Sequence, residues 1–170
     1  MFALVLTGPP GAGKSEIASC LHDSLGEADV DAALLEVDAL ERSYPPLDRE
    51  RSISHLATLA SSYREIGTGL LIVTATIEDD AYRDAVFGAT GADRHLLVRL
   101  EADPQTLRER LLAREPPGWD GLPELLNASR ALAASMETLD GVDLIVSTEG
   151  EQPEAVAARV EAALREAAPL

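Results

Sequence analysis

A lone lysine lies in the segment of this sequence that is best suited to chemistry. Lys14 is the only lysine among the 170 residues, and it belongs to the octapeptide Gly8-Pro9-Pro10-Gly11-Ala12-Gly13-Lys14-Ser15. This octapeptide fits the pattern G-x-x-x-x-G-K-[ST], in which glycines let backbone amides curve around a phosphate group. The lysine ammonium can bridge two phosphates, and the serine hydroxyl can ligate Mg²⁺. The motif therefore predicts a site for a nucleoside triphosphate, with ATP and Mg²⁺ as the expected cofactors.

The residues on either side of the octapeptide have the pattern that such a loop requires. An apolar run precedes it at residues 2–7, and a helical pattern follows from about Lys14 to Leu25. This order places the positive end of a helix against the phosphates. A Gly-rich turn that happens to contain a lysine is the alternative. The residues expected to bind the nucleotide here are Gly8, Pro9, Pro10, Gly11, Ala12, Gly13, Lys14, Ser15 and Glu16.

A carboxylate follows the second apolar run. Asp38 comes directly after residues 33–37, where it would face the terminal phosphate. It could accept a proton from an acceptor hydroxyl, or hold Mg²⁺ through a water. The alternative is a helix N-cap for the segment that begins at Ala39. Arg42 would project on the same side, either to bind the acceptor or to form a surface ion pair with Asp38 or Glu41.

The third apolar run, at residues 70–76, ends without an aspartate. Thr76 and Glu78 lie at its end, and they could bind the acceptor or reach the metal. Alternatively, Glu78 and the two aspartates after it form an acidic, solvated helix start. Proteins that hydrolyse a nucleotide to drive motion usually carry an aspartate at this strand end, so the sequence disfavours that class.

Arginines follow the fourth apolar run. Arg110 and Arg114 are one helical turn apart, so both project from one face near the end of a predicted helix. We expect both to neutralise charge on the transferring phosphoryl group, and Arg110 also to bind the nucleotide. Cations at a helix C-terminus are favourable in any protein, which is the alternative. Arg130, on the next predicted helix, could point back toward the phosphates as a substrate-binding residue.

Two loops complete the candidate site. Residues 115–121 are a loop by composition and could close over the nucleotide as a lid, within about residues 114–123. Trp119 in this loop either stacks on a ligand or anchors the loop to the core. Thr148 lies in the turn after the fifth apolar run, where it could contact the nucleobase. A plain turn between a strand and a helix explains Thr148 equally well.

Five apolar runs alternate with helical patterns along the chain. They cover residues 2–7, 33–37, 70–76, 95–100 and 143–147. Each is apolar enough for a strand buried on both faces. The alternation predicts an α/β fold of three layers, a five-stranded parallel sheet with helices on both faces and ligands at the carboxyl ends of the strands. Residues 1–170 are expected to form one domain. Leu107, Leu111 and Leu112 are the expected buried side of the helix that begins at Pro104.

Composition and charge exclude several classes of partner. The chain carries fourteen basic and thirty acidic residues, for a net charge of −16. A field of this sign repels nucleic acid and anionic membrane surfaces. No signal peptide is visible, and no apolar stretch approaches the roughly 20 residues of a membrane span. Cys20 has no partner for an internal disulfide, which suits a reducing compartment. We therefore expect a cytoplasmic monomer or homodimer.

The order of these features resembles that of the small P-loop kinases related to the nucleoside monophosphate kinases. The resemblance covers nearly the whole chain. It is strongest to kinases that act on hydroxyl groups (shikimate, gluconate, adenylylsulfate and chloramphenicol phosphotransferases) and to kinase-like proteins often labelled AAA-family ATPases. The resemblance implies that Lys14, Ser15, Asp38 and the pair Arg110 and Arg114 carry the activity.

The chain departs from that group at the acceptor end. It lacks the Thr-Gly-Arg stretch with which adenylate kinases hold AMP. It also lacks the Gly-Gly-Gly run of shikimate kinases, and Thr74-Ala75-Thr76 stands in its place. The motifs therefore specify the phosphoryl donor and not the acceptor.

These features together predict an ATP- and Mg²⁺-dependent kinase that acts on a hydroxyl of a small molecule. Asp38 would be the base or orienting group. The acceptor would lie against residues 40–68, whose arginines and tyrosines could hold a polar or anionic metabolite. The alternative is a regulatory ATPase or switch that acts through a partner protein. A guanine-specific switch is excluded, because its Asn-Lys-x-Asp motif needs a second lysine.

Overall fold

The strands form one parallel sheet in the computed structural model, which describes residues 1–168. They are β1 (Phe2–Thr7), β2 (Ala32–Glu36), β3 (Leu70–Thr74), β4 (Arg94–Glu101) and β5 (Leu144–Ser147). Their order across the sheet is β2-β3-β1-β4-β5, and each pair of neighbours is parallel. The predicted α/β class and the five parallel strands are confirmed.

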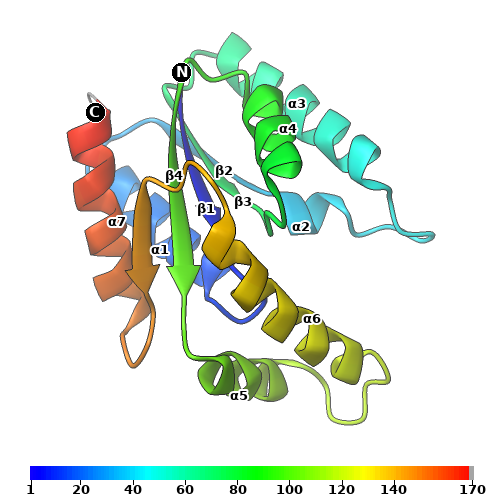
Figure 1. The fold of residues 1–170 in the computed structure, drawn as a ribbon. Coiled ribbons are helices and arrows are strands. Elements are labelled where there is room, and N and C mark those ends of the chain that lie inside the picture. Colours follow the sequence, from blue (N-terminus) through cyan, green and yellow to red (C-terminus); the bar gives the residue numbers. More distant parts are fainter. Residues whose placement is uncertain (169–170) are drawn as a thin grey trace.

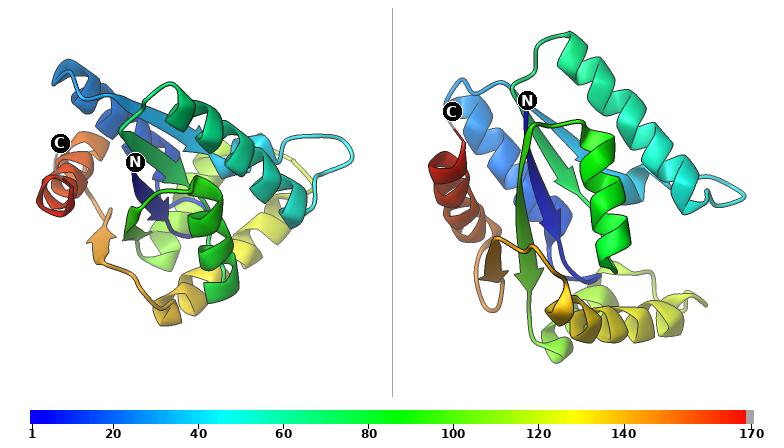
Figure 2. Two further views of the ribbon diagram at one scale, coloured as in Figure 1. Left: turned by 90° about the horizontal axis from the view of Figure 1, so that it is seen from above. Right: turned by 45° about the horizontal axis from the view of Figure 1, so that its top comes forward.

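Helices cover both faces of this sheet (Figures 1 and 2). They are α1 (Lys14–Glu27), α2 (Val37–Leu40), α3 (Arg49–Glu65), α4 (Asp80–Thr90), α5 (Pro104–Arg114), α6 (Leu122–Ser135), the 3₁₀ turn η1 (Met136–Thr138) and α7 (Pro153–Ala167). One face carries α1 and α7, and the other carries α3 and α4. Within the described residues, no helix is both long and apolar enough to cross a membrane.

Alternate residues of the central strand enter different cores. Leu4 and Leu6 of β1 pack in the core beneath α1 and α7. Ala3 and Val5 pack in the core beneath α3 and α4. Because successive side chains of a strand point to opposite faces, a strand covered on both faces must be apolar throughout. The continuous apolar run of β1 has this cause.

Two expectations about burial are wrong. β5 is an edge strand, so Ile145 is 50% exposed and only Val146 of this strand is buried. On α5, Leu107 and Leu111 are buried, but Leu112 is 41% exposed. A helix of eleven residues that packs along one side buries positions four apart, and the residue next to them turns toward solvent.

Helices α5 and α6 lie beyond the carboxyl ends of the strands. Figure 1 shows α5 and α6 at this end of the sheet, below the tips of β1 and β4. The buried Ser129 of α6 donates a hydrogen bond to the carbonyl oxygen of Pro10 at 2.8 Å. α6 is therefore tied directly to the loop that follows β1.

The contrast between two leucines on α5 gives a test of this packing. Leu107 is 1% exposed and belongs to the core beneath α1, so Leu107→Ala should lower the free energy of unfolding by about 2–5 kcal/mol. Leu112→Ala on the same helix should change it by no more than about 0.5 kcal/mol. Urea unfolding of both variants measures the difference, and equal losses would contradict the packing described here.

Candidate active site

The loop after β1 forms a backbone cradle that two glycines make possible. Gly11 has φ of 89°, and a Cβ on it would lie 2.9 Å from the carbonyl oxygen of Leu107. Gly8 is equally confined, because its Cβ would lie 2.5 Å from the carbonyl oxygen of Leu100. Larger residues would be strained or would push β4 and α5 away. The motif's glycines therefore hold the loop close to both elements.

A cavity of about 610 Å³ opens on this cradle. Its volume suits a small ligand or cofactor. Of the residues expected to act on the nucleotide, those that line it are Pro10, Gly11, Ala12, Gly13, Lys14, Ser15, Glu16, Asp38, Arg110, Arg114 and Thr148. Gly8 and Pro9 are buried behind the cradle. The structure thus brings together residues from the ends of β1 and β5, from α2 and from α5.

The Lys14 ammonium is held in this cradle away from water. Its side chain is 8% exposed and donates to the carbonyl oxygen of Gly8 at 2.9 Å. Burial lowers the pKa of Lys14. The carboxylate of Asp38 raises it, Arg114 lowers it and Glu36 raises it. The neighbouring carboxylates oppose the effect of burial on this ammonium but do not cancel it, so the desolvated cation is suited to receiving an anionic phosphate.

A second carboxylate lies where the metal would be held. The Ser15 hydroxyl donates a hydrogen bond of 2.5 Å to Oε2 of Glu36, the last residue of β2. Sequence reasoning missed Glu36, because it extended this strand through Val37. The available signal was an acidic residue at the last position of an otherwise apolar strand. Mg²⁺ usually takes only a few protein ligands, because water and phosphates supply the others. The hydroxyl of Ser15 and the carboxylate of Glu36 therefore fit that ion.

Asp38 lies in the first turn of α2, with Glu36 at the N-cap position. The alternative reading of Asp38 as the N-cap is therefore wrong. Its side chain is exposed, lines the cavity and accepts a long hydrogen bond of 3.5 Å from the Thr76 hydroxyl. Since its charge acts on Lys14, Asp38 has both a link to the phosphate cradle and a face free for another molecule.

The two arginines of α5 have different positions. Arg110 donates to the hydroxyl and carbonyl oxygens of Thr148, at 2.8 and 2.7 Å, and to the carbonyl oxygen of Gly11 at 3.3 Å. Arg110 therefore joins the cradle to the turn after β5. Arg114 is exposed and pairs with Glu115, and its charge acts on Lys14. Of the two, Arg114 is the better placed to meet the terminal phosphate.

The segments that follow Asp38 and β3 carry further carboxylates. Arg49, at the start of α3, pairs with Glu78 at 2.8 Å and Asp79 at 3.5 Å, and lies over the ring of Tyr82 at 4.3 Å. Asp79 is also the N-cap of α4, as the alternative reading of this acidic segment predicts. Burial raises the pKa of Glu41, and the nearby Asp38 raises it further.

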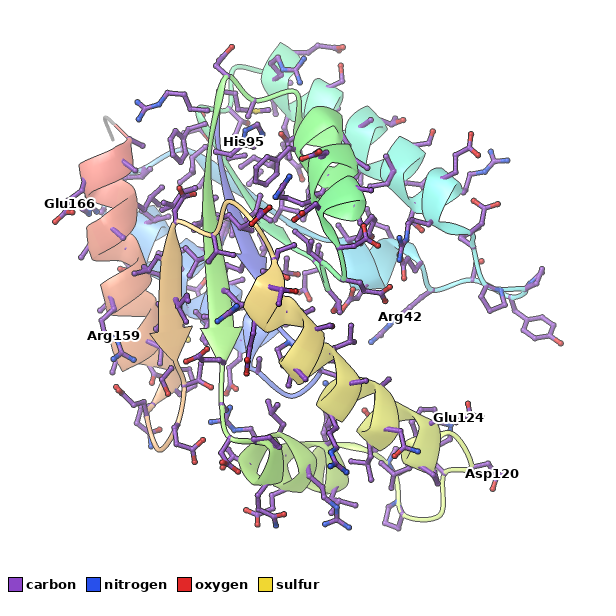
Figure 3. The ribbon with its side chains drawn as sticks, viewed as in Figure 1. Arg42, His95, Asp120, Glu124, Arg159 and Glu166 are labelled. Atoms are coloured by element: carbon purple, nitrogen blue, oxygen red, sulfur yellow. The ribbon has the colours of Figure 1, made fainter. Side chains whose placement is uncertain are left out.

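Several predicted residues do not line the cavity, namely Thr76, Glu78, Arg42, Arg130 and Trp119. Arg42 is exposed and forms no ion pair within residues 1–168, and Figure 3 shows its side chain extending away from the segment that follows α2. Arg130 lines a separate hollow that also touches Pro9. Trp119 is partly exposed and lies against Gly121 of its own loop. None of these contacts supplies a phosphate ligand by itself.

The buried lysine leads to a prediction about stability and pH. The pKa of Lys14 in the folded protein is below 10.5, its unfolded value. Between these two pKa values the unfolded chain binds more protons, so the free energy of unfolding rises with pH. Without nucleotide, Lys14→Met should flatten this rise and make the protein more stable at neutral pH. Denaturant unfolding across this pH range measures both effects. Arg108→Met on the exposed side of α5 should keep the rise, and a Lys14→Met protein that is less stable at neutral pH would contradict the expectation.

Comparisons with known proteins agree with this fold. The model of a family described as an AAA domain matches residues 4–120. A probable adenylyl-sulfate kinase of Archaeoglobus fulgidus is 27% identical over 132 residues, which are 71% of this chain and 85% of that protein. An unliganded sugar kinase of a Janibacter species superposes with a TM-score of 0.72 at 20% identity, over 97% of this chain and 95% of that one. The APS kinase of Mycobacterium tuberculosis, solved with AMPPNP and APS, gives 0.69 at 19% identity, over 96% of each chain. At such identities the two structures establish the fold alone. The family match spans well over half of the sequence, and the chain belongs to this family of AAA domains.

Proposed function

We propose that this protein is a phosphotransferase that uses ATP and Mg²⁺ to phosphorylate a hydroxyl group of a small molecule. The relatives whose names state an activity are kinases of small molecules. The observation that carries the proposal is that one cavity joins Lys14 and Ser15 of the phosphate cradle to the exposed carboxylate of Asp38. A phosphate cradle alone would serve any nucleotide-binding protein, whereas a carboxylate beside it with a free face suits an acceptor hydroxyl.

The transfer makes one phosphorus–oxygen bond and breaks another. The acceptor oxygen bonds to the γ-phosphorus, and the bond from that phosphorus to the β–γ bridging oxygen breaks. Asp38 orients the hydroxyl and takes its proton as the new bond forms. Lys14 and Arg114 stabilise the negative charge that the β-phosphate and the transferring group carry. The products are ADP, the phosphate ester and a proton, which Asp38 releases to water.

The remaining side chains position the nucleotide and its metal. Arg110 and Thr148 form the wall next to the turn after β5, where the nucleobase end of ATP would lie. The Ser15 hydroxyl and the Glu36 carboxylate would hold Mg²⁺, with Asp38 available through a water. When bound, Mg²⁺ neutralises phosphate charge.

Asp38→Asn tests the transfer step. The variant should bind ATP as the parent protein does, but should lose phosphoryl transfer by about 100-fold or more, the usual scale for a general base. The measurement follows label from γ-labelled ATP into a pool of small metabolites. Asp23→Asn, on the exposed side of α1, is the matched control and should transfer normally. If label appears only as free phosphate with every pool, the protein is an ATPase or switch, and if it stays on ATP the enzymatic proposal is withdrawn.

Two further substitutions separate binding of the nucleotide from binding of the metal. Lys14→Ala should abolish the heat of ATP binding in calorimetry, because the variant lacks the buried ammonium group that would contact the phosphates. Glu36→Gln should keep ATP binding without Mg²⁺, but should raise the Mg²⁺ concentration needed for half-maximal transfer by about tenfold or more. An unchanged Mg²⁺ requirement in Glu36→Gln would remove Glu36 from the metal site.

A further inference from the structure

A second cavity, of about 320 Å³, is bordered by α5 and α6. The same two helices border the nucleotide cavity, but the two cavities share no lining residue. We propose that this second cavity, the α5–α6 pocket, is a binding site for a small organic anion, which Arg108 and Arg130 hold by a carboxylate or phosphate group. The site does not depend on the proposed kinase activity, because none of its residues takes part in the transfer.

The two arginines of the α5–α6 pocket have no partner within residues 1–168. Nine of the thirteen arginines use the side chain for an ion pair, a hydrogen bond or a contact with an aromatic ring. The other four are Arg42, Arg51, Arg108 and Arg130. Two of these four line the same pocket. Since the chain carries thirty acidic residues that could pair with them, two unpaired cations in one hollow indicate a place for an anionic ligand.

The helix spacing explains why both arginines remain unpaired. A helical side chain meets the residues three and four positions away. Around Arg108 and Arg130 these positions hold Pro104, Gln105, Leu111, Leu112, Leu126, Asn127, Ala133 and Ala134. None of them is a carboxylate, and no carboxylate lines the pocket. The pocket therefore contains two cations without a counter-ion, and a bound anion would offset their mutual repulsion.

The hollow on the other side of Arg130 does not supply the missing counter-ion. Its carboxylates are Glu101, Asp103, Glu137 and Glu149. Glu101 pairs with Arg99 at 3.2 Å, and Asp103 caps α5. Glu149 accepts hydrogen bonds from the Thr106 hydroxyl at 2.6 Å and from the backbone amide of Asp103 at 3.0 Å. None of the four forms an ion pair with Arg130, so its positive charge remains available to a ligand.

The other lining residues indicate the size and chemistry of the ligand. A guanidinium group binds the oxygens of a carboxylate or phosphate two at a time, and the exposed Asn127 amide can donate a further hydrogen bond. Pro104, Pro123 and Leu126 supply apolar surface. A pocket of this volume is far larger than an inorganic ion needs. The arrangement therefore suits an organic molecule with an anionic end and a carbon body.

The pocket has a wall that is fixed without a ligand. Ser129 lines the pocket, is buried, and donates its hydroxyl hydrogen to the carbonyl oxygen of Pro10 at 2.8 Å. This bond holds α6 against the phosphate cradle. The overall negative charge of the protein does not cancel the two arginines, because charges more than about 8–10 Å away are largely screened at physiological ionic strength. The nearby cations therefore decide which ligand enters.

Calorimetry with the Lys14→Ala protein tests the α5–α6 pocket separately from the phosphate cradle, which would itself attract phosphates. The probes are glycerol 3-phosphate, succinate and the neutral molecule glycerol. We expect at least one of the two organic anions to bind with a Kd below about 1 mM, and glycerol not to bind. Binding of glycerol 3-phosphate alone would identify a phosphate site, and binding of succinate would show that a carboxylate suffices. If neither anion binds, the inference is wrong.

Substitutions then show whether the two arginines hold the anion. Added to the Lys14→Ala protein, Arg108→Gln and Arg130→Gln should each raise the Kd of the bound anion by about tenfold or more. Both side chains are exposed, so the thermal unfolding midpoint should stay the same. Arg51→Gln, which removes another exposed and unpaired arginine on α3, is the matched control and should change the Kd by less than about twofold. Equal weakening by all three substitutions, or an unchanged Kd in both pocket variants, would overturn the proposed site.

Discussion

The site depends on one buried ammonium group whose burial is not fully compensated by the protein. Within residues 1–168 the Lys14 ammonium donates one hydrogen bond, to the carbonyl oxygen of Gly8, and its burial outweighs the charges of Asp38 and Glu36 in setting its pKa. A cation in this position is unfavourable in the free protein and becomes favourable when an anion arrives. The cradle is therefore built for a ligand and not for the stability of the free protein. Its glycines, pressed against Leu100 and Leu107, keep the backbone where that ligand needs it.

The sheet order explains why so many functional side chains meet at one edge. β1 is central, with β3 and β2 on one side and β4 and β5 on the other. The strand order therefore reverses next to β1, and α/β proteins bind ligands at the carboxyl ends of the strands at such a point. Glu36 and Asp38 arrive from one side, and Arg110 with Thr148 from the other. The Arg110 contacts with Gly11 and Thr148 join these sides across the cradle.

The sequence predicts the donor end of the site well, because its chemistry is local. Eight consecutive residues define the cradle, and the apolar runs around them give the strands and their parallel arrangement. Asp38 follows from its place just after a strand. Glu36 does not, since it meets Ser15, 21 residues away in the sequence, only through the fold. The partners of Arg110 were equally hidden, because Thr148 lies 38 residues away and meets it only through the fold.

The acceptor end of the site is harder to predict from the sequence, because its residues are far apart along the chain. The residues around Asp38 come from separate segments, and no short motif connects Glu41, Glu78 and Tyr82. From the sequence alone, the arginines and tyrosines between residues 40 and 68 could hold a polar or anionic metabolite. In the folded protein Arg49 is held by Glu78 and Asp79, while Arg64 donates to the carbonyl oxygen of Thr90, the last residue of α4. A count of charges along a segment therefore does not fix the charge that a ligand meets, because pairing within the fold decides which cations remain free. Of the arginines in that segment, Arg42 is exposed and forms no ion pair within residues 1–168, so its charge remains available to a ligand.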